Sequence, residues 1–320
     1  MAHHDLTRTL DWRGRTVAWD RLGDGPPLVL LHGTPWSSAL WRPVADVLAE
    51  RFTVHLWDMP GFGRSSKHAG HDVDLATQGE LFADLLDLWG LERPHLVAHD
   101  VGGAVALRAL LLHGRQHASL CLVDVVALRP WGSPFFSLVQ EHADVFAQLP
   151  PAIHRGVVEA YVRGASHRGL ADADLAMLVD PWCDDVGQAA FYRQVAQADE
   201  AHTAELEPLL ADLAGPVHVV WGRDDTWIPV DRASRLQAAI PHASLAILDD
   251  AGHLVQLDAA DALTAELVRW TESVRAPSPS RPRTPGGAHP SGSTRRRRGR
   301  RGCPRRRRGR RRDRRRGRGR

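Results

Sequence analysis

The segment LVAHDVGG, residues 96–103, places a carboxylate where an apolar run ends. Asp100 has the small residue Ala98 two positions before it and Gly102 two positions after it. This spacing is typical of a sharp strand-to-helix turn, which presents its central side chain to a cleft and aims the next backbone N–H at the same space. The usual central residue is Ser, but a carboxylate is also a nucleophile and needs no base to activate it. The pattern predicts a nucleophilic Asp100, and an Asp that merely caps the following helix is the alternative.

Three further segments place polar groups directly after apolar runs. They are HGTPWSS at 32–38, VVWGRDDTWIP at 219–229 and LDDAGHLVQLD at 248–258. The first offers the backbone N–H of Thr34, the second the carboxylate of Asp225, and the third the imidazole of His253. Ligands of an α/β sheet collect beyond the carboxyl ends of its strands. We therefore expect these three groups to meet Asp100 in one cleft.

The elements that must position these residues follow from the hydrophobic pattern. Apolar runs typical of buried strands occur at 16–22, 27–33, 52–58, 95–100, 119–124, 216–222 and 245–250. Several are apolar on both faces, as strands of a mostly parallel sheet are. Helical spacing at 75–90 and at 259–273 alternates with them. This order predicts a doubly wound α/β sheet.

Domain boundaries follow from changes in this pattern. Helical stretches without a convincing strand occupy residues 130–209, which predicts a helical insertion into an α/β core made of 1–129 and 210–275. Residues 276–320 are Pro, Ser, Gly and Arg with almost nothing apolar, which predicts a disordered tail. That tail holds 20 of the 41 Lys and Arg residues, so the remaining chain is acidic, with 21 basic against 37 acidic residues.

Composition narrows the class of protein. With 43% hydrophobic and 25% charged residues the chain has the composition of a soluble globular protein. No apolar run reaches the roughly 18 residues of a membrane span, and the N-terminus lacks the apolar centre of a signal peptide. The cysteines, at 121, 183 and 303, are far apart and lack metal-ligand spacing. We therefore expect a cytoplasmic protein.

From roughly residue 10 to 274 the chain resembles the α/β-hydrolase superfamily, in the branch of epoxide hydrolases and haloalkane or haloacid dehalogenases. The resemblance rests on HG-x-P, D-x-P-G-F-G-x-S, H-D-x-G-G, G-x-x-D and G-H, taken together. It implies that Asp100 is the nucleophile, His253 the base that activates water, and Asp225 the acid that orients His253. Backbone N–H groups of Thr34 and Val101 would form the oxyanion hole, beneath a helical cap.

Two acids compete for the third place in this triad. Asp225 fits the third position after Gly222, where the family has its acid. Asp124 ends the run SLCLVD, where some dehalogenases have theirs instead. Asp225 is favoured, and Asp124 is the alternative.

The leaving group separates the two enzyme classes. Opening an epoxide leaves an alkoxide that needs a proton. The enzymes that this chain resembles, the epoxide hydrolases, share the feature of supplying that proton from tyrosines of the cap. The chain has two tyrosines, and AAFYRQ at 189–194 is similar to the N-W-Y-R segment of those enzymes. This favours Tyr192, with Tyr161 as the second candidate. The alternative is that both are packing residues of a helical cap.

A departing halide needs weakly hydrated donors instead, usually indole N–H groups. Haloalkane dehalogenases have Trp directly after the nucleophile and haloacid-specific relatives have Arg, whereas this chain has Val101. Thr34 stands where dehalogenases often have Asn or Glu. Candidate pocket residues that retain indole groups are Trp36, Trp131 and Trp182, although large apolar packing is the ordinary role of Trp.

The sequence thus predicts a hydrolase that opens epoxides to diols through a covalent ester on Asp100. A haloalkane or haloacid dehalogenase is the second reading, and a non-catalytic binding protein with the same fold is the third. The implied partners are a small apolar electrophile and water, with no metal or organic cofactor and no membrane. Nucleic acid binding is expected only through the Arg-rich tail.

Overall fold

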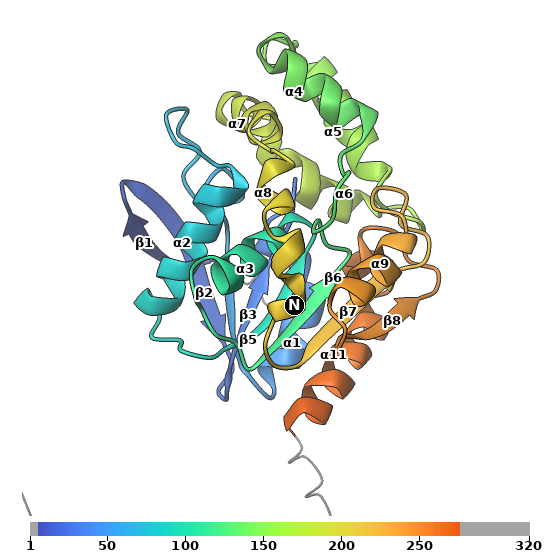
Figure 1. The fold of residues 1–320 in the computed structure, drawn as a ribbon. Helices are drawn as coiled ribbons and strands as arrows, with labels where there is room; N and C mark the ends of the chain where they lie inside the picture. Colours follow the sequence, from blue (N-terminus) through green and yellow to red (C-terminus); the bar gives the residue numbers. More distant parts are fainter. Residues whose placement is uncertain (1–5, 276–320) are drawn as a thin grey trace, which may run out of the picture. The chain divides into compact units, whose positions relative to one another are not determined.

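A computed structural model describes residues 6–275, so the tail predicted to be disordered lies outside the described residues. Eight strands form one sheet in the order β1-β2-β4-β3-β5-β6-β7-β8 (Figure 1). β1 and β2 run antiparallel to their neighbours, and the other six strands are parallel. The strands are β1 (Arg8–Trp12), β2 (Arg15–Leu22), β3 (Pro27–Leu31), β4 (Thr53–Trp57), β5 (His95–His99), β6 (Ser119–Val123), β7 (Val217–Gly222) and β8 (Ser244–Leu248). The predicted mostly parallel α/β sheet is confirmed.

The sequence pattern did not indicate β1. Three of its five residues are exposed, so the segment has no apolar run, and it lies at the edge of the sheet. It pairs with β2 through a two-residue turn at Arg13 and Gly14, which both have positive φ, at 52° and 79°. A turn of this kind joins antiparallel strands with the right twist.

Helices cover both faces of the sheet. α1 (Arg42–Ala49) and α11 (Ala260–Arg275) pack together on one face, and α2 (Leu75–Leu88) and α3 (Val101–Leu111) pack together on the other, with α9 (Asp231–Ala239). Successive side chains of β3 alternate between the two cores: Leu28 and Leu30 join the first, and Val29 and Leu31 the second. This double burial explains why such strands are apolar throughout.

Between β6 and β7 the chain is helical. The helices are α4 (Pro134–Phe146), α5 (Pro151–Arg163), α6 (Asp172–Val179), α7 (Asp185–Ala196) and α8 (Ala201–Ala204), and a short α10 (Val255–Asp258) precedes α11. The described residues also form three short 3-10 helices, η1 (Ser38–Trp41), η2 (Asp180–Trp182) and η3 (Glu207–Asp212). Figure 1 shows α4 to α7 gathered at one end of the sheet. Among the described residues, none of the helices has both the length and the apolar character needed to cross a bilayer.

Candidate active site

Asp100 occupies the turn between β5 and α3. Its backbone has φ 53° and ψ −128°, a left-handed conformation that costs a non-glycine residue on the order of 1–3 kcal/mol. Two glycines make room for it. A Cβ at Gly102 would lie 2.4 Å from the carbonyl oxygen of His32, and a Cβ at Gly33 would lie 2.3 Å from the Cβ of Asp100. The small residues read from the sequence therefore have a steric cause.

The loop after β3 supplies a backbone donor to this carboxylate. The N–H of Thr34 donates to Oδ1 of Asp100 over 2.8 Å. Val101 is the first residue of α3, and the first N–H groups of a helix have no acceptor within it. Both residues line the cavity described below. Two backbone donors thus flank Asp100, as an oxyanion hole requires.

The D-x-P-G-F-G-x-S segment holds this loop in place. Oδ1 of Asp58 accepts from the N–H of Ser38, and Oδ2 accepts from the N–H of Arg64, each over 2.8 Å. The N–H of Met59 donates to Nε2 of His32 over 2.9 Å. Asp58 is buried and does not line the cavity beside Asp100, so this motif is a structural support for the loop.

His253 lies between two carboxylates. Its Nδ1–H donates to Oδ2 of Asp225 over 2.9 Å, and its Nε2 lies 3.2 Å from Oδ2 of Asp100. The other oxygen of Asp225 accepts from the backbone N–H groups of Trp227 and Ile228, over 2.8 and 2.9 Å. His253 is fully buried. Asp225 is therefore fixed from both sides and orients the imidazole toward Asp100.

The charges of neighbouring side chains and burial set the protonation states of His253, Asp100 and His99. Burial alone lowers the pKa of His253, but the carboxylates of Asp225 and Asp100 outweigh it and hold the pKa well above its usual value. Burial raises the pKa of Asp100, but the hydrogen bond and charge of His253 hold it below its usual value. Burial, and then the charge of His253, lower the pKa of His99 to about 3. At neutral pH the site thus holds an imidazolium, and a neutral His99 donates from Nε2 to the His253 carbonyl over 2.9 Å.

Asp124, the alternative acid, is placed differently. It is fully buried at the end of β6, and its Oδ1 accepts from the N–H of Gly222 over 2.8 Å. Burial and then the charge of Asp225 raise the pKa of Asp124 well above its usual value. Asp124 is consequently the protonated member of this pair, and Asp225 is the one beside the base.

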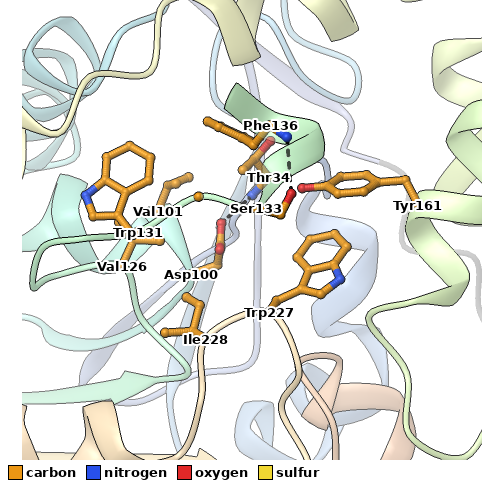
Figure 2. A pocket seen from close by; sticks show the side chains of 11 residues that line it. Thr34, Asp100, Val101, Val126, Trp131, Ser133, Phe136, Tyr161, Trp227 and Ile228 are labelled. Carbon is orange, nitrogen blue, oxygen red and sulfur yellow. Dashed lines mark hydrogen bonds between the residues drawn. The ribbon is translucent and has the colours of Figure 1, made fainter. Parts of the chain in front are cut away.

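A cavity opens onto Asp100, with about 420 Å³ of space unfilled by protein atoms when the open solvent at its mouth is included (Figure 2). Its walls come from the loop after β3, the turn at Asp100, the helical segment and the loop after β7. The eleven lining residues are Thr34, Asp100, Val101, Val126, Trp131, Gly132, Ser133, Phe136, Tyr161, Trp227 and Ile228. Of these, Asp100 is the one with a charge. The cavity suits a small neutral apolar molecule.

The structure places Tyr161 at the cavity, and not Tyr192, which the sequence favoured. Tyr192 is 1% exposed, does not line the cavity, and its hydroxyl bonds to Nδ1 of His154 over 2.8 Å. Tyr161 does line the cavity, and Figure 2 shows its hydroxyl pointing inward. Burial and then the charge of Asp100 raise the pKa of Tyr161, so its phenol keeps its proton. Similarity to an N-W-Y-R segment located Tyr192 along the helix but not the direction of its side chain.

Of the three candidate tryptophans, the structure brings one to the cavity. Trp131 lines it, and its Nε1–H donates to Oγ1 of Thr203 over 2.8 Å. Trp182 is buried, with its Nε1–H donated to the carbonyl of Pro35 over 2.9 Å. Trp36 is buried as well and stacks on Trp227. Trp36 and Trp182 are not among the residues that line this cavity, and their contacts support its walls.

Two residues at the site were missed. Trp227 lines the cavity and lies two positions after Asp225, in a segment that was read only for its acids. Gln194 of α7 accepts from the hydroxyl of Thr34 over 2.7 Å and so links the helical segment to the loop after β3. The proximity of Trp227 to the acid was a usable signal, whereas nothing in the sequence pairs Gln194 with Thr34.

Comparison with known proteins identifies the family of this fold. Residues 26–260 match the family described as alpha/beta hydrolase fold. An alpha/beta hydrolase fold protein from Burkholderia ambifaria is similar at 43% identity and TM-score 0.81, over 83% of this chain and 98% of that one. A pimeloyl-[acyl-carrier protein] methyl ester esterase from Aeromonas salmonicida is 30% identical, over 74% of this chain and 92% of the esterase. The ancestral haloalkane dehalogenase AncHLD2 shares the fold, at 20% identity and TM-score 0.72, over 84% and 100%.

Proposed function

The chain belongs to the α/β-hydrolase family, and from that premise we propose that it opens small neutral epoxides to diols through a covalent ester on Asp100. The observation that carries the proposal is the carboxylate of Asp100 at the tip of β5, 3.2 Å from Nε2 of His253 and facing Tyr161 across one cavity. Residues 130–209 would act as the cap over a core made of residues 1–129 and 210–275.

The first half of the reaction opens the ring. An oxygen of Asp100 attacks an epoxide carbon, the C–O bond of the ring breaks, and its electron pair goes to the ring oxygen. The phenol of Tyr161 gives that oxygen its proton, which leaves a phenolate. Esterification removes the negative charge of Asp100 and so lowers the pKa of His253. The imidazolium then releases its proton to the phenolate and becomes a base.

The second half frees the diol. Nε2 of His253 takes a proton from water as the oxygen of that water attacks the ester carbonyl carbon of Asp100. The N–H groups of Thr34 and Val101 hold the oxyanion. The acyl C–O bond breaks, the leaving alkoxide takes the proton back from His253, and the new carboxylic acid returns its proton to the imidazole. Asp100 is again a carboxylate beside an imidazolium.

The charge of the cavity supports a neutral substrate. Asp100 is the charged residue of the lining, and the cation beside it, His253, is shared with Asp225, so a substrate carboxylate would be repelled. This disfavours haloacids within the proposal. A haloalkane remains the second candidate. The indole N–H of Trp131 is already donated to Thr203 and that of Trp182 to Pro35, whereas the buried indole N–H of Trp36 has no acceptor among the described residues.

The test is the intact mass of the full chain carrying His253→Gln, after incubation with a panel of neutral epoxides, haloalkanes, haloacids and methyl esters. Without its base the enzyme should alkylate itself and stop at the ester. We expect a mass increase equal to a whole epoxide, located on the Asp100 peptide by fragmentation. The double variant Asp100→Ala/His253→Gln is the matched control and should gain no mass.

Three other outcomes of this experiment would change or overturn the proposed reaction. An adduct that lacks its halogen would replace the epoxide with a haloalkane and keep Asp100 as nucleophile. Turnover of methyl esters by the wild-type chain, with no adduct on Asp100 from epoxides or haloalkanes, would overturn the alkyl-ester mechanism. No adduct and no turnover across the panel by folded protein would overturn the proposed reaction.

A further inference from the structure

Trp227 lies at the centre of an aromatic stack beside Asp100. Its ring is 5.1 Å from that of His253 with 25° between the planes, and 4.3 Å from that of Tyr161 with 24° between the planes. On the core side it stacks on Trp36 at 5.6 Å and 18°. All three partners lie nearly parallel to the indole, so the contact is made by ring faces.

The backbone of the same residue reaches the acid. The N–H of Trp227 donates to Oδ1 of Asp225 over 2.8 Å, while the other oxygen of Asp225 bonds to Nδ1 of His253. Trp227 therefore contacts the acid through its main chain and the base and the phenol through its side chain. The proposed reaction requires these three groups to stay correctly positioned relative to Asp100.

We propose that Trp227 is a positioning residue of this site, whose indole face holds the rings of His253 and Tyr161 in place and stabilises the protonated imidazole. The inference rests on the proposed function for the role of Tyr161, but the contact with His253 is independent of substrate. An aromatic face attracts a cation through its quadrupole, and indole does so most strongly. His253 carries a positive charge at rest and again after it deprotonates water, so the stack favours both states.

Other titratable side chains also lie around the imidazole of His253. Asp225 and Asp100 face its two nitrogens, and Asp124 at the end of β6 is protonated and adds no charge. The ring of His99, on β5, lies 4.8 Å from that of His253 and is neutral, because burial and the charge of His253 lower the pKa of His99 to about 3. None of these side chains is removed when Trp227 is replaced, so a change in the titration midpoint of His253 measures the contribution of the indole ring.

The first experiment needs no substrate. In the 15N-labelled full chain the imidazole resonances of His253 are followed against pH for wild type, Trp227→Phe and Trp227→Leu. We expect the midpoint to fall by about one pH unit in the Leu variant, and by less in the Phe variant, which keeps an aromatic face. Trp89→Leu is the matched control, because half-buried Trp89 packs on a different histidine, His55, at 5.4 Å. It should leave the midpoint of His253 unchanged.

An unchanged midpoint in a folded Trp227→Leu variant would overturn the inference, whatever the substrate is. Should Trp227→Leu fail to fold, Trp227→Phe and Trp227→His supply the comparison, because indole, phenyl and imidazole faces attract a cation to different extents. Equal midpoints in those two variants and the wild type would also overturn it.

The second experiment uses whichever epoxide forms the adduct on Asp100. In single-turnover reactions, Trp227→Leu should slow both ester formation and ester hydrolysis by roughly tenfold or more, because it releases both Tyr161 and His253. Trp227→Phe should recover most of both rates. If no epoxide reacts with any variant, the proposed function fails while the titration still tests the stack.

Discussion

Asp124 and Asp225 follow adjacent parallel strands, and of the two it is Asp225 that reaches Nδ1 of His253, over 2.9 Å. Asp124 instead gives one oxygen to the N–H of Gly222, and its raised pKa keeps it protonated. A protonated carboxyl is a neutral donor, so it can support Asp225 without competing for the imidazole. Two acids at neighbouring strand ends thus acquire different tasks from their surroundings.

Asp225→Asn should therefore abolish most of the activity, whereas Asp124→Asn should not. An amide at 225 favours the wrong tautomer of His253 and removes the charge that stabilises its imidazolium, which in a comparable triad costs roughly ten-thousandfold in kcat. An amide at 124 keeps a neutral donor, and we expect kcat within about tenfold of wild type. Steady-state kinetics on the substrate identified by mass spectrometry measure both. The reverse ranking would move the triad acid to Asp124.

Tyr161→Phe should slow ring opening, while Tyr192→Phe should leave it nearly unchanged. A positioned proton donor contributes roughly 10²- to 10⁴-fold, and Tyr161 is the tyrosine in the cavity. Tyr192→Phe should instead lower the free energy of unfolding by about 1 kcal/mol, because it removes the hydrogen bond to His154. The rate of ester formation in single turnovers and urea unfolding separate the two effects. Equal slowing by both variants would contradict the assignment.

The success and failure of the sequence predictions have a common physical basis. The sheet and the region of Asp100, Asp225 and His253 were predictable, because strands buried on both faces are apolar throughout and their ends meet at one edge. The match that favoured Tyr192 fixes a position along α7 but not which side of the helix faces the cleft. β1 was missed because its exposed edge residues carry no apolar pattern.

The contacts between the helical segment and the core are the part that sequence reasoning could not supply. Gln194 and Thr34 are 160 positions apart, and their hydrogen bond depends on how α7 docks over the loop after β3. The stack of Trp227 on Tyr161 has the same origin. Tertiary docking of this kind leaves no periodicity in either segment.

The link between Gln194 and Thr34 should be measurable as a coupling energy. Gln194→Leu leaves the buried hydroxyl of Thr34 without its acceptor, which we expect to lower the free energy of unfolding by about 1–3 kcal/mol. Adding Thr34→Val should then cost little more, because both partners are gone, so the double variant is less destabilised than the sum of the singles. Urea unfolding of the four proteins gives the cycle.

Gln197→Leu is the matched control for that cycle. Gln197 also links α7 to the core, since it accepts from the N–H of Val73 over 2.6 Å, but it does not bond to Thr34. Its combination with Thr34→Val should be additive. Equal coupling in both cycles would mean that the whole helical segment loosens, with no specific link at Thr34.

The ion pair between His253 and Asp100 should make stability depend on pH in a defined direction. The pKa of His253 is raised by folding, so its contribution is fully present below its unfolded value of about 6.5 and is lost as pH rises through the folded value. The pKa of Asp100 is lowered, so its contribution is present above about 3.9 and is lost as pH falls through the folded value. Both contributions are present together between about pH 4 and 6.5.

The free energy of unfolding of wild type relative to His253→Gln should therefore be largest in that window and should shrink toward pH 9. Tyr192→Phe, whose tyrosine has a pKa of about 12, should show a constant difference from wild type between pH 6 and 9. A His253→Gln difference that is equally constant would mean that the imidazole is neutral at rest, and the proton that it is proposed to release to the Tyr161 phenolate would have to come from solvent.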